Sequence, residues 1–244
     1  MTVLTFAPNN VDYYVHADNH NDDGDDEDNN DNDNNNDDGH DSGDDGRNSG
    51  DEDERDDESQ RNEDGDFEDE NAISVCCTWG PEMADGILTY SIENDADPEK
   101  KDAVMRAVNA WNIELDGIQL LESDDDEDIE ISFRGDGENI AGKTVNYFDG
   151  YGLIRESRVT ISEEFYDIDF NPAQIEQITK HEIGHVLGLG HANFNGNLMT
   201  EKVSTGSGTI SPCEVNAVKV ANAWKTEGNG NSIELPKERY VRCQ

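Results

Sequence analysis

Apolar residues divide the chain into two parts with different patterns. Between residues 18 and 70 only Phe67 is hydrophobic, so this stretch cannot bury enough apolar surface to offset the entropy that is lost on ordering. We therefore expect an acidic, disordered N-terminal segment at residues 1–71. From residue 72 onward apolar residues are frequent enough for one core. We expect a single domain at residues 72–227, followed by a C-terminal tail at residues 228–244.

A helix is predicted to begin at Asn171, where several signals of a helix start coincide. Asn171 is a suitable N-cap, Pro172 suits the first helical position, and Gln174 completes a pattern close to a capping box. The helix should run to about residue 187. Its apolar positions are Ile175, Ile178, Ile183, Val186 and Leu187.

A second helix start lies near the end of the domain. The sequence Ser211-Pro212-Cys213-Glu214 is a capping box with proline at the first helical position. We expect a helix from this point to about Trp224.

The charge of the chain excludes two classes of partner. There are 59 acidic and 17 basic residues, a formal net charge of -42. Such a polyanion cannot bind a phosphate backbone by releasing counterions, and anionic membrane surfaces repel it, so we expect no nucleic-acid partner. No stretch approaches the length of apolar sequence that a transmembrane helix needs, so we expect no membrane span.

The acidity is divided between both parts of the chain. Residues 1–71 hold 28 acidic residues and 3 arginines, a net charge of -25, and the remaining 31 acidic and 14 basic residues give -17. At this density like charges repel one another in the folded state unless salt screens them. An acidic protein from ordinary salt is one interpretation. We favour the other, a microbial, haloarchaeal protein that works in molar salt.

The Asp- and Gly-rich N-terminal segment also raises the question of calcium. Its best match to an EF-hand loop runs from Asp41 to Glu52, but Gly43 stands at the third position and no helices flank the loop. A solvated polyanion is the better interpretation. Calcium is therefore a cofactor that the composition allows and the motif does not support.

The cysteines leave their pairing open. Cys76 and Cys77 stand at the start of the domain, Cys213 lies within it, and Cys243 is close to the C-terminal end. A disulfide that ties the two ends together and free buried thiols are both compatible with this spacing. The spacing fits neither a zinc ribbon nor a CxxC redox motif.

Three histidines at the end of the first predicted helix have the spacing of a metal site. His181 and His185 are four residues apart, so both imidazoles lie on one helix face. On a continuing helix His191 would lie about 80° off that face and roughly 15 Å from His181 along the axis. Gly188 stands where a helix ends in a left-handed turn, and we expect this turn to bring His191 back to the other two.

Three neutral imidazoles with one open position are typical of a catalytic zinc site rather than a structural one. Glu182, next to His181, points to one side of the metal and cannot be a fourth ligand on the same face. It is placed to accept a proton from water on the metal and to pass it to a leaving amine.

The segment HEIGHVLGLGH, from His181 to His191, matches the HExxHxxGxxH signature and resembles the metzincin metalloproteases. Met199, eight residues further on, matches the methionine of the Met-turn, which underlies the zinc in that group. Within the metzincins the chain is most similar to the matrixins. The segments ILTYSIEND, PEKKDAVMRAVNAWN and DIEISFRG resemble their first strand, first helix and following strand.

The resemblance covers residues 79–227 and implies an α+β fold. The catalytic domain would contain a twisted, mixed and mostly parallel sheet with two long helices and a zinc cleft. A small C-terminal subdomain with a third helix would follow His191. The segment Gly142–Phe148 would be the antiparallel edge strand to which a substrate adds, and the loop from Met199 to Ser211 would form one wall of the S1′ pocket.

The resemblance also implies a function. We expect a zinc-dependent endopeptidase that cleaves proteins or peptides with one catalytic zinc ion, acting as a monomer. After residue 40 the histidines are His181, His185 and His191, so no second zinc site of the animal matrixin kind is expected. The alternative is a non-catalytic zinc-binding module whose acidic tail binds ions or proteins.

The place of action stays open at this point. The resemblance implies an extracellular enzyme. The N-terminal sequence MTVLTFAPNNVDYYVHADNH has no basic region and no long apolar stretch, so no signal peptide is visible and a cytoplasmic protein is the other expectation.

The net charge makes the stability of the domain dependent on salt. We expect the melting temperature to fall when KCl is lowered below roughly 0.5 M, because screening of the repelling carboxylates weakens as the Debye length grows. Thermal melts followed by circular dichroism over a KCl series would measure this. The same melting temperature at low and molar KCl would contradict it.

Overall fold

The computed structural model describes residues 13–21, 71–123, 127–134, 140–165, 168–203, 208–227 and 232–244. The chain divides into two units, one made of residues 1–22 and 67–244 and the other of residues 23–66. The described residues all belong to the first unit. Of the segment at residues 1–71 that we expected to be disordered, residues 1–12 and 22–70 lie outside the described residues, as does the calcium-like loop Asp41–Glu52.

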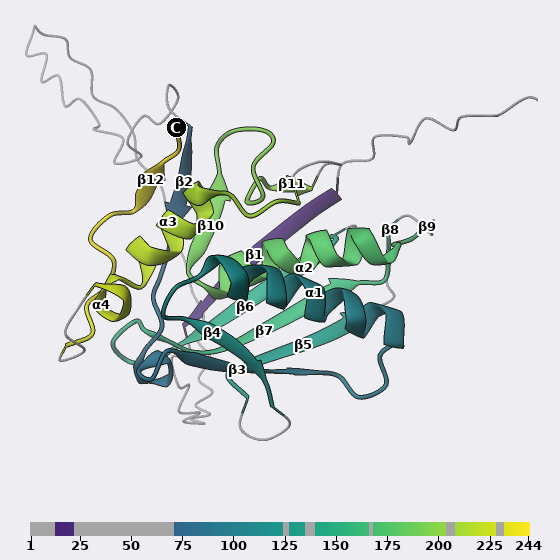
Figure 1. The fold of residues 1–244 in the computed structure, drawn as a ribbon, viewed down its shortest axis with the longest axis horizontal. Coiled ribbons are helices and arrows are strands. Elements are labelled where there is room, and N and C mark those ends of the chain that lie inside the picture. Colours follow the sequence, from purple (N-terminus) through teal and green to yellow (C-terminus); the bar gives the residue numbers. More distant parts are fainter. Residues whose placement is uncertain are drawn as a thin grey trace, which may run out of the picture. The chain divides into compact units, whose positions relative to one another are not determined.

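A mixed sheet forms the centre of this unit (Figure 1). Among the described residues it has seven strands in the order β11-β1-β6-β7-β5-β3-β4. Neighbours are parallel except β6 with β7 and β1 with β11. The mostly parallel arrangement agrees with the expected fold class. The strands are β1 (Tyr13–Asn21), β3 (Ile87–Ile92), β4 (Gln119–Glu122), β5 (Ile129–Arg134), β6 (Gly142–Phe148), β7 (Ile154–Ser162) and β11 (Lys202–Val203).

Two long helices cover one face of the sheet (Figure 1). They are α1 (Pro98–Glu114) and α2 (Pro172–Val186), which pack against each other. Helix α1 starts at Asp97, whose side chain accepts a hydrogen bond from the Glu99 N–H, and it buries one apolar face that includes Trp111. The Trp111 ring nitrogen donates to the carbonyl of Lys180 at 2.9 Å, which ties the two helices together.

Helix α2 begins as predicted. The Asn171 side chain accepts hydrogen bonds from the backbone N–H groups of Ala173 and Gln174, and the Gln174 side chain accepts from the Asn171 N–H, which completes a capping box. A short hairpin of β8 (Glu164–Phe165) and β9 (Ile168–Asp169) precedes it.

A second, smaller sheet joins segments from both ends of the domain. Its order is β10-β2-β12, with β2 (Ala72–Val75), β10 (Leu189–Ala192) and β12 (Tyr240–Arg242) all antiparallel to their neighbours. The remaining elements are η1 (Pro81–Met83), α3 (Pro212–Ala221) and α4 (Ala223–Thr226). Helix α3 starts with the predicted capping box at Ser211 and Glu214.

The domain boundary predicted at residue 227 leaves out a strand. Residues 240–242 form β12, Val241 is buried, and Cys243 is bonded to Cys213. A strand of three residues with one buried side chain has no recognisable alternation, which is why the pattern did not reveal it. The other two cysteines, Cys76 and Cys77, are bonded to each other. The terminal segment is thus held by its pairing with β2 and by a disulfide to α3, and not by a disulfide to Cys76 or Cys77.

The N-terminal strand β1 differs from two expectations. It lies within residues 1–71, which we expected to be disordered, and it pairs in parallel with β6 from Val15 opposite Gly142 to Asn21 opposite Phe148. The expectation that Gly142–Phe148 is an open edge is therefore wrong for this structure. Main-chain hydrogen bonds make this pairing, and they need no apolar side chains, so a polar sequence does not exclude it.

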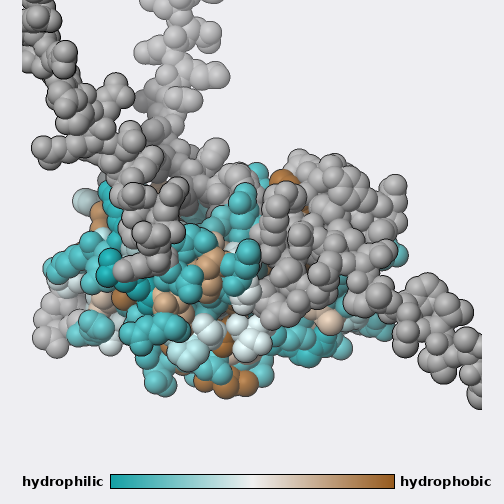
Figure 2. All heavy atoms as spheres, turned by 90° about the horizontal axis from the view of Figure 1, so that it is seen from above, coloured by the Kyte–Doolittle hydropathy of each residue, from teal (hydrophilic) through white to brown (hydrophobic). Residues whose placement is uncertain are grey.

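The described surface agrees with the composition. Seen from above, the side chains are mostly hydrophilic with a few apolar ones scattered among them (Figure 2). None of the helices in the described part of the chain is long and apolar enough to span a bilayer.

The bond between Cys213 and Cys243 closes a loop with a sequence separation of 30 and should stabilise the domain. We expect Cys243→Ser to lower the free energy of unfolding by about 3 kcal/mol, because the unfolded chain then regains the freedom of the open loop. Urea denaturation under non-reducing conditions would measure it. Cys213→Ser should have the same effect and the double variant no more; an unchanged midpoint for Cys243→Ser would contradict the prediction.

Candidate active site

Helix α2 fixes two of the three predicted metal ligands by hydrogen bonds to the main chain. The imidazole Nδ1 of His181 lies 2.7 Å from the carbonyl oxygen of Leu198, and that of His185 lies 2.8 Å from the carbonyl oxygen of Leu189. A carbonyl can only accept, so each Nδ1 carries the hydrogen and donates it. This sets the tautomer and the orientation of both rings.

Gly188 turns the chain directly after α2. Its φ of 94° is in the left-handed region, and a Cβ at this position would lie 2.3 Å from the carbonyl oxygen of Cys77. The chain then enters β10, which holds His191. The ring centroid of His191 is 5.6 Å from that of His181 and 4.9 Å from that of His185. The turn thus brings all three histidines together, with possible ligand nitrogens within 4.8 Å of one another.

The chemistry of these three side chains fits zinc. Burial, and then the neighbouring His185, lowers the pKa of His181 well below its usual range, so this ring stays neutral. With hydrogens on Nδ1, His181 and His185 turn their Nε2 atoms toward the same region, and these atoms are 2.9 Å apart. Two lone pairs that face each other are stabilised by a cation between them. Neutral imidazoles are common zinc ligands.

Glu182 lies on the same helix and is fully buried. Its Oε2 accepts a hydrogen bond of 2.6 Å from the hydroxyl of Thr144 on β6. Burial raises the pKa of Glu182 to about 8, and the Thr144 hydrogen bond acts in the opposite direction. Within the described part of the chain, Oε1 has no hydrogen-bond partner. The carboxyl group of this residue, which follows His181 on the helix, therefore has one oxygen held by Thr144 and one oxygen not held.

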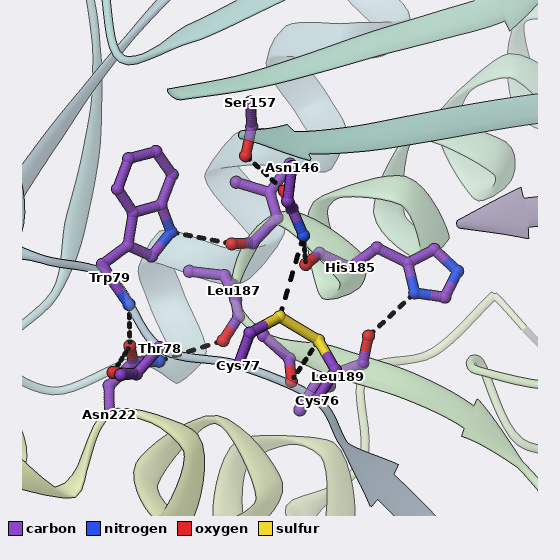
Figure 3. The surroundings of a disulfide bond; sticks show 12 residues. Cys76, Cys77, Thr78, Trp79, Asn146, Ser157, His185, Leu187, Leu189 and Asn222 are labelled. Atoms are coloured by element: carbon purple, nitrogen blue, oxygen red, sulfur yellow. Dashed lines mark hydrogen bonds between the residues drawn. A yellow bond between two sulfur atoms is a disulfide. The ribbon is translucent and has the colours of Figure 1, made fainter. Parts of the chain in front are cut away.

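The C-terminal end of α2 is held by side chains from distant segments (Figure 3). Three consecutive carbonyl oxygens, those of residues 185–187, accept hydrogen bonds from Asn146, Trp79 and Asn222 at 3.2, 2.7 and 2.9 Å. The Gly188 carbonyl accepts from the Cys76 N–H at 3.0 Å. The His185 carbonyl also accepts a hydrogen bond from the Gly188 N–H at 3.0 Å. A helix end leaves its last carbonyls without helical partners, and here each one is satisfied. The position of His185 is thereby fixed from outside the helix.

Met199, the residue predicted to form the Met-turn, lies directly against α2. It is fully buried, and a Cβ on Gly184 would lie 2.4 Å from its sulfur. Gly184 stands between His181 and His185 in the sequence, so Met199 supports the stretch of helix that carries them. The predicted S1′ loop, residues 199–211, includes residues 204–207, which lie outside the described part.

Glu214 connects the third helix to the site. It is fully buried and accepts hydrogen bonds from the N–H groups of Ser211 and Leu198 at 2.9 and 3.1 Å. The carbonyl of Leu198 in turn holds His181. The capping box identified Glu214 as a helix-start residue, but not this second role.

Several residues of the site were not predicted from the sequence. The side chains of Thr144, Asn146, Trp79 and Asn222 form hydrogen bonds with residues at least 35 positions away in the sequence. For Thr144 and Asn146 the sequence contained one weak signal. Both are polar, and in the predicted strand Gly142–Phe148 they lie on the same face.

Comparisons with known proteins agree with this geometry. The matrixin family model matches residues 79–219, which include β3 to β7, both long helices and all three histidines. Metalloendoproteinase 2-MMP of Arabidopsis thaliana is 30% identical over 173 residues, which cover 61% of this chain and 44% of that protein. The chain thus spans less than half the length of this relative. Since the family model matches more than half of the chain, the protein belongs to the matrixin family, and this membership supports a metalloprotease hydrolase.

Proposed function

We propose that this protein is a zinc-dependent endopeptidase in which His181, His185 and His191 hold the zinc and Glu182 is the general base. The observation that carries the proposal is the convergence of the three histidines, with possible ligand nitrogens within 4.8 Å of one another, together with the fully buried Glu182 that follows His181 on the same helix. Membership of the matrixin family supports it.

The chemistry divides between the metal and the glutamate. Zinc, when bound, polarises the peptide carbonyl and makes water a stronger acid. Glu182 would accept the proton of the attacking water and deliver it to the nitrogen of the departing amine. A pKa near neutrality suits a group that both takes and returns a proton, and burial moves the pKa of Glu182 in that direction.

The other site residues have supporting roles in this proposal. Leu198 and Leu189 orient His181 and His185 through their carbonyls, and Met199 supports the helix beneath them. Gly188 provides the turn that returns His191 to the cluster. The substrates would be proteins or peptides, cleaved in high salt if the acidity of the chain reflects its working solvent.

Removing the carboxylate tests the reaction. We expect Glu182→Gln to bind one zinc ion per chain while losing about 10²- to 10⁴-fold in kcat for casein or mixed peptides in molar salt, because the general base is gone and the ligands are not. Metal analysis after dialysis and peptide cleavage would measure the two properties.

His185→Ala is the matched control, since it should lose zinc as well as activity. If the unmodified protein binds one zinc and cleaves no peptide, it is a zinc-binding module and the proposed function is wrong.

The burial of Glu182 also makes the stability of the zinc-free protein depend on pH. Its folded-state pKa is about 8 and the ordinary value is 4.5, so the folded protein holds the proton more tightly than the unfolded chain. This stabilisation is complete below pH 4.5 and is lost as the pH rises to 8. The loss should approach at most about 1.4 kcal/mol per pH unit.

Urea denaturation of the chelator-treated protein at several pH values would measure the effect. Other groups titrate in the same range, so the contribution of Glu182 is the difference between the unmodified protein and Glu182→Gln. The variant should lose less stability on going from pH 5 to pH 8; parallel curves for the two proteins would refute the assignment.

A further inference from the structure

We propose that Thr144 and Gly142 of β6 are positioning residues that set the place of the Glu182 carboxylate and thereby the rate of peptide hydrolysis. The inference rests on the proposed function, because it holds that residues of β6 position Glu182, the residue proposed to transfer the proton. Neither residue belongs to the zinc-binding signature.

The register of β6 presents both residues to α2. Burial alternates along the strand, with Gly142, Thr144 and Asn146 buried and the residues between them partly exposed. On the β7 side, Gly142 pairs with Ile161 and Thr144 with Val159, and both partners are fully buried. The backbone beneath Glu182 is therefore held in a packed sheet and has little freedom to follow the side chain.

The Thr144 hydroxyl lies within hydrogen-bond distance of two oxygen atoms of Glu182. Its hydroxyl lies 2.6 Å from the carboxyl Oε2 and 3.2 Å from the main-chain carbonyl oxygen of the same residue. A hydroxyl has one hydrogen, and the closer contact to a group that can carry charge is the stronger one. The Thr144 hydrogen bond thus distinguishes the two carboxyl oxygens: Oε2 is occupied, and Oε1 is left to exchange a proton.

Gly142 provides the room in which the carboxyl group lies. A Cβ at this position would be 2.4 Å from Oε1, 2.9 Å from the carboxyl carbon and 2.8 Å from Cγ2 of Ile178. Real Cβ atoms do not approach other atoms so closely, so any larger residue would displace the carboxyl group. The backbone of Gly142 is not in the left-handed region, so the requirement for glycine is one of space and not of chain conformation.

The contacts of Thr144 separate a positioning role from metal binding. Among the described residues its hydroxyl hydrogen bonds go to Glu182, whereas His181 and His185 are oriented by the carbonyls of Leu198 and Leu189. Loss of the hydroxyl should therefore leave zinc binding intact and alter only the step that depends on Glu182.

The test compares variants of the full chain loaded with zinc. Thr144→Val keeps the shape of the side chain and removes the hydrogen bond, and we expect kcat to fall about 10- to 100-fold with unchanged KM and one zinc per chain. Thr144→Ser restores the hydroxyl and should return kcat to within about threefold of the original value. Thr160→Val, on the neighbouring strand β7, is the matched control and should leave kcat unchanged.

Gly142→Ala provides an independent test that does not depend on the threonine. It should lower kcat by a similar factor because the new methyl group displaces the carboxyl group. Gly150→Ala is its control, since a Cβ at Gly150 meets no atom within 4 Å. Should Thr144→Val fail to fold, the contrast between these two alanine variants decides the question.

Infrared spectroscopy tests the hydrogen bond between Thr144 and Glu182 without an activity measurement. In the zinc-free protein the carboxyl band of Glu182, identified by its loss in Glu182→Gln, should move to higher wavenumber in Thr144→Val and stay in place in Thr144→Ser. A hydrogen bond to the carboxyl oxygen weakens the C=O bond, so removal of the hydrogen bond should raise the wavenumber of the carboxyl band.

The outcomes separate the two proposals. If the unmodified protein cleaves peptides and Thr144→Val or Gly142→Ala cleaves them with the same kcat, the positioning role is wrong and the proposed function stands. If the unmodified protein binds zinc and cleaves nothing, the proposed function fails, and with it the claim that these residues control a rate.

Discussion

The active site depends on where helix α2 stops. The helix must carry His181 and His185 and then end at once, because His191 can join them only after the chain has turned at Gly188. Ending a helix inside a folded domain leaves carbonyl oxygens without helical partners and away from water. In this protein Trp79 and Asn222 donate to the carbonyls of residues 186 and 187, and Asn146 donates to the His185 carbonyl, which also accepts from the Gly188 N–H.

This requirement connects parts of the chain that are far apart in sequence. Asn146 comes from the central sheet, Trp79 from the segment before η1, and Asn222 from the junction of α3 and α4. The Asn222 side-chain oxygen also accepts a hydrogen bond of 3.0 Å from the Thr78 hydroxyl. The junction of α3 and α4 and the strand β6 therefore meet at one helix end. The three histidines are positioned by contacts across the domain rather than by the helix alone.

The features that could be predicted from the sequence are those with short-range causes. The start of α2 follows from Asn171, Pro172 and Gln174, and the shared face of His181 and His185 follows from a spacing of four. The match to the matrixins covered the main strands and helices. These patterns are local, and a single sequence displays them directly.

The remaining features depend on contacts that no local pattern encodes. In β6 the apolar residues Val145 and Tyr147 would suggest that their face is the buried one, whereas Thr144 and Asn146 are buried because α2 offers them hydrogen-bonding partners. The bond of Cys213 to Cys243 likewise follows from the docking of β12 onto β2. Spacing alone left its partner open.

The pairing of strand β1 with β6 affects how the molecule can bind an extended peptide. From end to end β6 is paired with β7 on one side and β1 on the other, and a strand has only two sides that can form main-chain hydrogen bonds. A peptide that binds by extending the sheet at β6 must therefore displace a segment of the same chain. That competitor is tethered, so its effective concentration is set by the connecting chain and does not fall when the protein is diluted.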